Sequence, residues 1–501
     1  MSTNTRAEES EGVQFPLVDG KRSSQRSGKQ LFAEAVRNVD PELFEEIQKT
    51  SDWRKNYLEP VKKIVEVGAT SAAKALRIAA DGTKAVRDTM VFERDGADLP
   101  LAEAFDTPRT DGLDTFEIKG EGTRSGDLEV PFGKDNLRGD VLRKQLDRWA
   151  DEGTIEQSCS EAVKLVVANP DWMDLSDLHF AVLGAASEMG PMRALCHWGA
   201  TAYAIDLPRP RLWELIRGIA RDGTGKVLIP TKPGGSSENL VEFAGTDLLS
   251  QGPEVRAWLS SFDTPLAVGD YTYADGTTFV RVSAAVDALT EGLRRDGKLR
   301  CSAYLATPTD VFAVPEQVAA ETRGKKESVS ASGARLATLG RMCKPNYETL
   351  VSDEGGRRWG LSDCLVAQQG ANYALAKNLQ KWRATELRGN GLLTSANVAP
   401  PTRTHSVTKN RILAAAYNGG STFGVTAFAP PTARTLMAAL LVHDLRNPKA
   451  PANPENELGH PYELLSDAAA HGGIWRLHHE PRTILPLAVL VGFARRSPKN
   501  R

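Results

Sequence analysis

Two side chains with complementary proton chemistry, Tyr373 and Lys377, form the one Y-x-x-x-K pattern of the chain. On a helix, a spacing of four places both side chains on the same face. An ammonium group beside a phenol stabilises the phenolate and lowers its pKa from about 10, which prepares the hydroxyl for proton transfer. The lysine can also donate hydrogen bonds to ribose hydroxyls. The pair therefore predicts an acid–base site on a helix over 371–388.

A strand, a turn and a helix that could hold a cofactor beside this pair stand earlier in the chain. The spacing predicts a buried strand over 179–183, a small-residue turn over 184–190, a helix over 191–198 and a second strand over 201–205. Glycines at such a turn let the backbone approach a pyrophosphate, and amide groups at the helix start attract the anion. The pattern is typical of a βαβ unit that binds a dinucleotide, and a core turn without a ligand is the alternative.

An acid ends the second strand of this unit. Asp206 is placed to accept hydrogen bonds from the ribose hydroxyls of the adenosine, which favours NAD over NADP. Arg209 and Arg211 follow closely and could instead hold the 2′-phosphate of NADP. Asp247 stands where a carboxylate could reach the adenine edge.

Strands alternate with helices through the rest of the C-terminal two thirds, which predicts an α/β protein with a right-handed, doubly wound parallel sheet. Further strands are expected at 227–230, 240–244, 265–269, 302–306 and 392–397, and further helices at 213–220, 281–293, 371–388 and 435–445.

The chain divides by composition into three parts. Residues 1–28 are polar and predict a disordered arm, and 29–168 predict a mostly helical domain with a loop-rich connector. This domain would be a cap or a dimerisation arm. Residues 169–501 hold the sheet, with an insertion at about 311–360 and an extension at about 446–501. The insertion would be a mobile lid, or else an exposed loop or oligomer contact.

Composition excludes several classes of function. The 501 residues have a net charge of −2, which gives no electrostatic footprint for nucleic acid. The five cysteines lack C-x-x-C spacing, and His471, His478 and His479 lack ligands at metal spacing, so neither disulfides nor a metal site is expected. No signal region or membrane span is expected, since the apolar run 484–493 is short and suits a buried strand. A cytoplasmic protein acting on a small molecule fits best.

Three motifs together resemble the short-chain dehydrogenase/reductase family. Residues 183–190 resemble its T-G-x-x-x-G-x-G motif, Tyr373 and Lys377 match Y-x-x-x-K, and 397–404 resemble N-x-x-x-P-G-x-x-x-T. The resemblance implies a Rossmann fold, bound NAD or NADP, Tyr373 as the proton donor or acceptor, and Lys377 as its pKa tuner and a ribose ligand. The cofactor-binding residues that it implies are Gly184, Ala186, Ser187, Met189, Gly190, Lys377, Pro400 and Thr402.

The chain departs from this pattern in the cofactor motifs. Leu183 replaces a threonine, Glu188 replaces a glycine, and Pro401 stands where a glycine is expected. A carboxylate at position 188 would repel a pyrophosphate unless it points away.

Two catalytic positions depart as well. The family's substrate-binding serine has no direct counterpart: Thr307 or Thr309 supplies the hydroxyl, with Thr309 slightly preferred, or Ser362 does so by sequence distance. Asp287 stands in place of an asparagine, which puts a proton relay through that position in doubt.

The motifs lead to one functional hypothesis with two alternatives. We expect an NAD(P)-dependent oxidoreductase that interconverts an alcohol and a carbonyl on a largely apolar small molecule, with a homodimer as a further expectation. The apolar preference comes from 405–430, the segment that forms the substrate pocket in the family. A non-catalytic NAD(P)-binding sensor or scaffold is one alternative, and an epimerase or lyase that retains NAD is the other.

Overall fold

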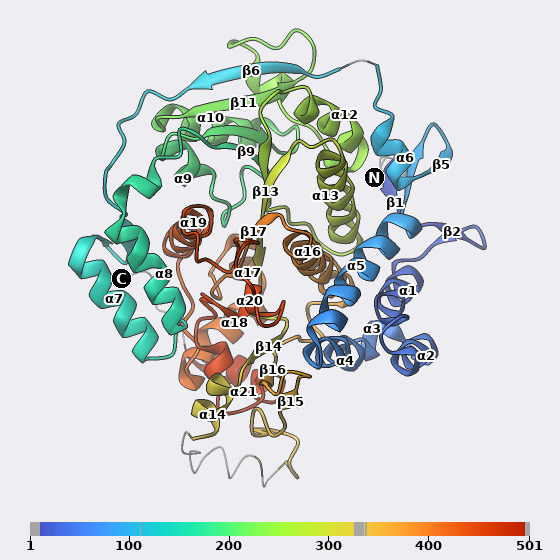
Figure 1. Ribbon diagram of the computed structural model, residues 1–501, viewed down its shortest axis with the longest axis vertical. Coiled ribbons are helices and arrows are strands. Elements are labelled where there is room, and N and C mark those ends of the chain that lie inside the picture. Colours follow the sequence, from blue (N-terminus) through green and yellow to red (C-terminus); the bar gives the residue numbers. More distant parts are fainter. Residues whose placement is uncertain (1–10, 111, 325–334, 336–337, 496–501) are drawn as a thin grey trace.

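A seven-stranded sheet organises the protein, which we describe from a computed structural model for residues 11–495 except 111, 325–334 and 336–337 (Figure 1). Neighbouring strands are parallel except at one edge, where β6 runs antiparallel to β11. The expected α/β class is therefore confirmed. In spatial order the strands are β17 (Leu393–Val398), β13 (Leu299–Ala306), β12 (Leu266–Asp270), β9 (His179–Leu183), β10 (Thr201–Ile205), β11 (Lys226–Thr231) and β6 (Asp114–Lys119).

The order of the parallel strands is compatible with a Rossmann-like fold. Counted along the chain from β9, they lie in the order 3-2-1-4-5-6, and the strand order reverses between β9 and β12. Ligands of such sheets bind outside the carboxyl ends of the strands at this reversal. The central strands form because short apolar runs are buried on both faces, as all of β12 is.

Helices cover both faces of the sheet, because alternate residues of each strand enter different cores. Ala181 and Leu183 of β9 belong to one hydrophobic cluster, and Phe180 and Val182 belong to the other. The first cluster includes α12 (Leu248–Ser260), α13 (Thr277–Arg295) and α16 (Ala371–Gly389). The second includes α7 (Gly139–Asp151), α8 (Gln157–Ala168), α9 (Met192–His197), α10 (Pro210–Asp222) and α19 (Pro430–Arg446).

The N-terminal helices pack against helices that cover one face of the sheet. They join the first cluster, and Phe32 packs edge-on against Trp382 of α16 with ring centroids 5.7 Å apart. They are α1 (Ser24–Val36), α2 (Pro41–Lys49), α3 (Trp53–Asn56), α4 (Leu58–Ala69), α5 (Ala72–Thr89) and α6 (Leu101–Asp106).

The expectation of a disordered arm over 1–28 needs correction for 11–28, since residues 1–10 lie outside the described part. Val13 is buried, and its carbonyl accepts a hydrogen bond from Arg281 of α13. This contact holds β1 in a small antiparallel sheet with β4 and β5. The short strands of this half are β1 (Gly12–Gln14), β2 (Leu17–Val18), β3 (Lys21–Arg22), β4 (Val91–Arg94), β5 (Ala97–Pro100), β7 (Val130–Phe132) and β8 (Asp135–Leu137).

The insertion has a sheet of its own, with the order β14-β16-β15. An ion pair of 2.7 Å between Asp310 and Lys381 of α16 anchors its start. Residues 325–334 and 336–337, which include Lys325 and Lys326 of the expected lid, lie outside the described residues. The described elements of the insertion are β14 (Val311–Pro315), α14 (Glu316–Arg323), β15 (Val351–Ser352) and β16 (Arg358–Asp363).

Two expected strands are helical instead. Residues 240–243 form α11, and the apolar run 484–493 lies in α21, where only Ile484, Ala488 and Gly492 are buried. A short apolar run does not by itself distinguish a strand from a helix. The remaining elements are α17 (His405–Lys409), α18 (Arg411–Gly420), α20 (Glu463–Ser466), α21 (Pro481–Ala494) and the 3-10 turns η1 (Pro170–Met173), η2 (Ser421–Phe423) and η3 (Ile474–Arg476).

A buried polar cluster ties the C-terminal extension to α8. The imidazole Nε2 of His471 lies 2.7 Å from Glu156, and Arg476 donates to the same carboxylate at 2.6 Å. The backbone N–H of Gly473 donates to Nδ1 of His471, so the proton of the neutral ring lies on Nε2 and points to Glu156. Burial raises the pKa of Glu156, but the hydrogen bonds from His471 and Arg476 and the charge of Arg476 act against it, and the pKa is lowered to about 2.

We expect Glu156→Gln to cost stability at neutral pH and little at pH 2. A carboxyl with a lowered folded-state pKa stabilises the protein above its unfolded pKa of about 4.5 and loses this contribution as the pH falls toward 2. The shift corresponds to about 3 kcal/mol. Urea unfolding of parent and variant between pH 7 and pH 2 measures the difference, and Glu161→Gln on exposed α8 surface is the control. A difference that does not change with pH would contradict this assignment.

Candidate functional site

The turn after β9 runs against the end of β12. Gly184 has a φ of 81°, and a Cβ placed there would lie 2.8 Å from the carbonyl oxygen of Tyr271. The N–H groups of Gly184 and Ala185 donate to Ile205 at the end of β10. Glycine is required at this position because a side chain fits neither the conformation nor the space. The turn is thus held at the carboxyl ends of β9, β10 and β12.

Asp206 binds this turn directly. One carboxylate oxygen accepts the N–H of Ala186 at 2.7 Å and the other accepts the N–H of Leu207 at 2.8 Å. Burial raises the pKa of Asp206, while these two amides and Arg209 act in the opposite direction. The carboxyl stays partly exposed, so each oxygen can accept a further hydrogen bond from a ligand. Asp206 therefore shapes the turn and remains half-buried.

Asp247 has a local structural role. Its side chain accepts the N–H of Leu249 at 2.9 Å and so caps α12. Next to it, the N–H of Thr246 donates to the backbone carbonyl of Asp206, which places Asp247 near the end of β10.

The helix after the turn is shorter than a dinucleotide fold usually has. α9 spans Met192–His197, so its dipole contributes little. The turn itself closes on hydrogen bonds from Ser187 to Gly184 and from Gly190 to Ser187, with Met189 half-buried beside them. The carboxylate of Glu188 accepts the N–H of His405 at 2.8 Å, so the acid that replaces a motif glycine is used at the start of α17.

Two arginines that the sequence did not point to stand beside the turn. Arg193 of α9 and Arg434 of α19 are close enough for their charges to interact, and neither makes an ion pair with a described residue. Half-burial lowers the pKa of Arg434, Arg193 lowers it further, and Glu188 opposes the shift. Two like charges without a partner would be neutralised by an anion bound at the turn.

Tyr373 lies in the first turn of α16, where its ring packs on Phe279 of α13 at a centroid distance of 5.6 Å. Burial raises the pKa of Tyr373, and a hydrogen bond from the Thr307 side chain acts in the opposite direction. The expected lowering of this pKa by Lys377 is therefore corrected. The phenol is held in its protonated form beside the carboxyl end of β13.

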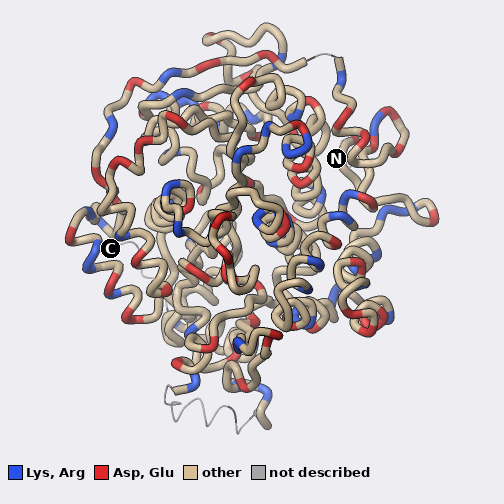
Figure 2. The backbone as a smooth tube through the Cα atoms, in the orientation of Figure 1, with Lys and Arg blue, Asp and Glu red and all other residues tan. Residues whose placement is uncertain are grey.

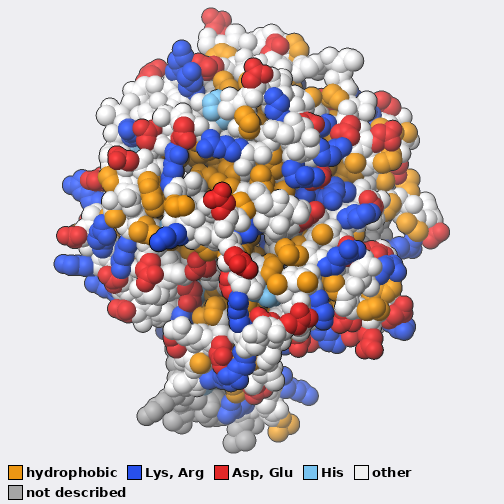
Figure 3. All heavy atoms as spheres, viewed as in Figure 1, with side chains coloured by type: hydrophobic (Ala, Val, Ile, Leu, Met, Phe, Trp, Pro, Cys, Tyr) orange, Lys and Arg blue, Asp and Glu red, His pale blue; other side chains and the backbone are white. Residues whose placement is uncertain are grey.

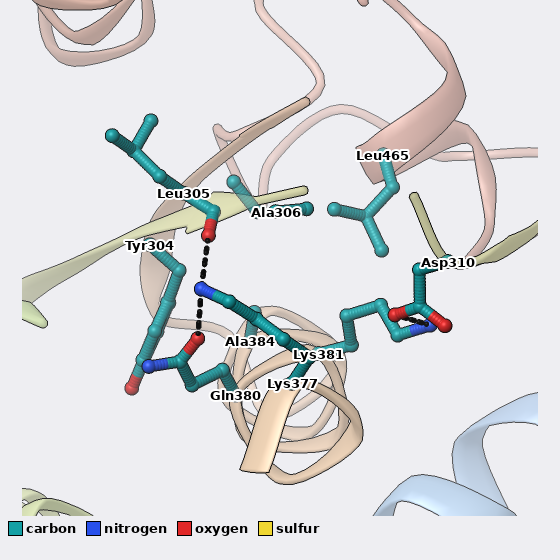
Figure 4. Close-up of a pocket in the computed structure, with 10 residues that line it drawn as sticks. Tyr304, Leu305, Ala306, Asp310, Lys377, Gln380, Lys381, Ala384 and Leu465 are labelled. Carbon is teal, nitrogen blue, oxygen red and sulfur yellow. Dashed lines mark hydrogen bonds and ion pairs between the residues drawn. The ribbon is translucent and has the colours of Figure 1, made fainter. Parts of the chain in front are cut away.

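Lys377 points from α16 toward Leu305, near the carboxyl end of β13 (Figure 4). Its Nζ donates to the carbonyl of Leu305 at 3.2 Å and to Oε1 of Gln380 at 2.9 Å. Gln380 donates in turn to Asp270 at 2.8 Å, and Asp270 is buried at the end of β12. Burial lowers the pKa of Lys377, whereas Asp270 and Asp310 raise it.

The space beside this lysine is small. The cavity between α16 and the ends of β13 and β17 holds about 10 Å³, enough for about one water molecule. A nicotinamide ring would have to bind outside it. On the face shown in Figure 3, hydrophobic side chains line a recess near the middle of the molecule.

Of the three hydroxyls expected near Tyr373, those of Thr307 and Thr309 lie together and that of Ser362 does not join them. Thr307 and Thr309 share a hydrogen bond of 2.9 Å, and Gln369 donates to Thr309 at 2.8 Å. Of these, Thr307 contacts Tyr373. Ser362 lies in β16 of the insertion, where its buried hydroxyl contacts Cys364 at 3.4 Å.

Asp287 forms ion pairs in the protein interior. Its carboxylate accepts Nε of Arg383 at 2.6 Å and Nη1 of Arg87 at 3.3 Å, in the interior between α13, α16 and α5. Because two arginines hold its carboxylate, the role of Asp287 in a proton relay stays in doubt.

The segment after β17 lies at the same carboxyl edge. Thr402 donates from its hydroxyl to the carbonyl of Pro400 at 2.8 Å and forms a parallel bridge with Phe428. Asn397 is buried and donates to Asp444 of α19 at 2.8 Å. The backbone after β17 is also tied to the end of β13, because the N–H of Ala399 donates to the carbonyl of Ala306.

No group of three or more His, Cys, Asp or Glu that could hold a metal ion lies within the described residues. No family model matches the chain, and neither a curated protein nor a solved structure matches it. The arrangement of the Gly184 turn, Asp206 and Tyr373 is therefore the basis for a functional proposal.

Proposed function

We propose that the protein is an NAD(P)-dependent oxidoreductase that reduces a carbonyl group on a largely apolar small molecule. One observation carries this proposal: the turn of Gly184, the carboxylate of Asp206 and the phenol of Tyr373 lie at the carboxyl edge of one sheet, around its strand reversal. These are the groups that a dinucleotide and a reacting carbonyl need. The bound nicotinamide would supply the hydride.

The chain's own residues divide the work of binding. The turn of 184–190 would lie beside the pyrophosphate, with Arg193 and Arg434 as counter-charges. Asp206 would accept hydrogen bonds from the adenosine ribose, which favours NAD, while Arg209 and Arg211 are exposed and could serve NADP. Lys377 would hold the second ribose after exchanging its bond to Gln380 for one to the ligand.

The state of Tyr373 favours the reductive direction. A phenol with a raised pKa stays protonated at neutral pH and can donate its proton to the oxygen that receives charge as hydride adds to carbon. Thr307 would orient the phenol and bind the same oxygen. In the oxidative direction the phenol would first have to lose its proton at a buried position, which costs free energy.

The internal hydrogen bonds of Lys377 favour a second candidate, a non-catalytic NAD(P)-binding sensor or scaffold. Its ammonium group is used by Leu305 and Gln380 and does not lower the pKa of Tyr373. The two candidates share the cofactor and differ in turnover. A carbonyl-substrate screen with bound NADH or NADPH separates them.

Replacing Arg434 with alanine should weaken NADH binding by about 10- to 100-fold, because a charge-assisted hydrogen bond contributes about 1.5–3 kcal/mol. Fluorescence titration of NADH and NADPH measures the affinities. Arg217→Ala is the matched control, since Arg217 lies on the outer side of α10 and pairs with Glu214. If neither nucleotide binds the parent protein, the cofactor assignment fails.

A further inference from the structure

The helices α18 and α21 form a tightly packed pair with a large exposed apolar surface. From Ile484 to Ala494 the sequence of α21 has no polar side chain. Its inner stripe is Ile484, Ala488 and Gly492, all buried. On the outer side, Leu490 is 64% exposed and Phe493 is 53% exposed. A soluble helix normally places polar residues on its outer face, so this surface is unusual.

Small residues fix the pair in this orientation. A Cβ added at Gly419 of α18 would clash with the backbone oxygen of Ala488, and one added at Gly492 of α21 would clash with that of Ala415. The backbones therefore touch, and neither helix can rotate its large side chains inward without losing this contact. Ile412, at the start of α18, is 53% exposed and extends the apolar surface.

The helices α17, α18 and α21 carry basic side chains and no acidic ones. No Asp or Glu occurs from Arg403 to His443 or from Pro481 to Arg501. Figure 2 marks acidic residues in red, and none lies on α17, α18 or α21. The exposed basic residues beside the apolar side chains are Lys409, Arg411 and Arg495. In the described part of the chain no carboxylate pairs with any of them.

From this surface we propose that the α18–α21 pair docks on an anionic lipid bilayer. Exposed Leu and Phe side chains would enter the boundary between headgroups and acyl chains, and Lys409, Arg411 and Arg495 would contact lipid phosphates. α21 spans Pro481–Ala494, which is about 21 Å and shorter than the ~30 Å of a hydrocarbon core, so it would lie on the bilayer. In the described part of the chain no helix is long and apolar enough to cross a membrane.

A bilayer fits this surface better than a second copy of the chain. A two-fold dimer places the same patch of both subunits in contact, so the basic residues Lys409, Arg411 and Arg495 of both subunits would share one interface. Like charges across an interface are destabilising, whereas anionic headgroups neutralise them. A mixed apolar and basic surface is also what interfacial helices share.

Docking would also suit the position of the candidate site. Tyr417 of α18 lies near enough to Tyr373 that an ionised Tyr417 would raise the pKa of Tyr373. The helix that carries Ile412 on its exposed end therefore reaches the site with its other face. Docking does not depend on the proposed reaction, but it would give an apolar substrate a path from the lipid along α18.

Vesicle flotation with the full chain tests the proposal. We expect binding to vesicles of phosphatidylcholine with phosphatidylglycerol, little binding to phosphatidylcholine alone, and weaker binding at high salt. Leu490→Glu and Phe493→Glu should each reduce binding by about tenfold or more. Val141→Glu on α7, where Val141 is 62% exposed, is the matched control and should bind like the parent.

Three outcomes would overturn the proposal. Absence of binding to anionic vesicles is the first, and equal binding by Leu490→Glu and the parent is the second. The third is a parent dimer in sedimentation that Leu490→Glu converts to a monomer without any vesicle binding, which would assign the surface to self-association. Arg411→Glu combined with Arg495→Glu gives an independent reading if an apolar replacement disturbs folding. NADH titration of the same variants, which should be unchanged, separates a failure of docking from a failure of the proposed reaction.

Discussion

Tyr373→Phe should slow carbonyl reduction by about 10²- to 10⁴-fold, the usual contribution of a positioned proton donor. Phenylalanine keeps the ring that packs on Phe279 and removes only the hydroxyl that Thr307 contacts. The affinity for NADH should therefore stay within a factor of about three, since the lost group is not expected to bind cofactor. Steady-state rates with saturating NADH, together with nucleotide titration, measure the two effects separately.

Tyr273→Phe is the matched control for this prediction. Tyr273 also packs near Phe279, at 5.3 Å, but it is 55% exposed and donates to Asp275. Its loss should leave the rate almost unchanged. Full activity of Tyr373→Phe would remove the acid–base role, and loss of NADH binding in the same variant would assign the tyrosine to cofactor binding instead.

The sequence best predicted the elements whose burial depends on residues close together in the chain. The apolar runs at 179–183 and 201–205 became β9 and β10 at the expected residues, because strands buried on both faces need an uninterrupted apolar run. The helix that holds Tyr373 and Lys377 also formed where their spacing placed it. The parallel sheet follows from the alternation of such elements.

It was least informative where a partner lies far away in the chain. Lys377 was expected to act on Tyr373 but bonds to Leu305, 72 residues earlier, and to Gln380. Arg193 and Arg434 meet only after α9 and α19 are packed on the same face of the sheet. A spacing of four tells which face two residues share, and it does not tell what else faces them.

The same reasoning explains the apolar run of 484–493. Its length and composition suited a buried strand, but it packs on α18, where Gly419 allows close contact with a helix. The sequence periodicity of Ile484, Ala488 and Gly492 is helical, which is a signal that composition alone hides.

Arg383→Leu should lower the free energy of unfolding by about 3–5 kcal/mol, because it removes the closest counter-charge of the buried carboxylate of Asp287. The guanidinium of Arg383 is 2% exposed and pairs with Asp287, Glu291 and Glu386. Urea unfolding followed by circular dichroism measures the loss. Asp287 is itself 2% exposed in its side chain, and Arg87, at 3.3 Å, would be its remaining ion-pair partner.

Arg294→Ala is the control for this prediction, since Arg294 pairs with Glu291 from a side chain that is 44% exposed. It should cost less than about 1 kcal/mol, as exposed ion pairs do. Arg383→Leu combined with Asp287→Leu should recover part of the loss, because the double variant no longer buries the carboxylate that Arg383 paired with. If Arg383→Leu costs no more than Arg294→Ala, Asp287 is not held mainly by this pair. A role for Asp287 in proton transfer would then become open again, and the pH dependence of the reduction in Asp287→Asn would be the measurement that decides it.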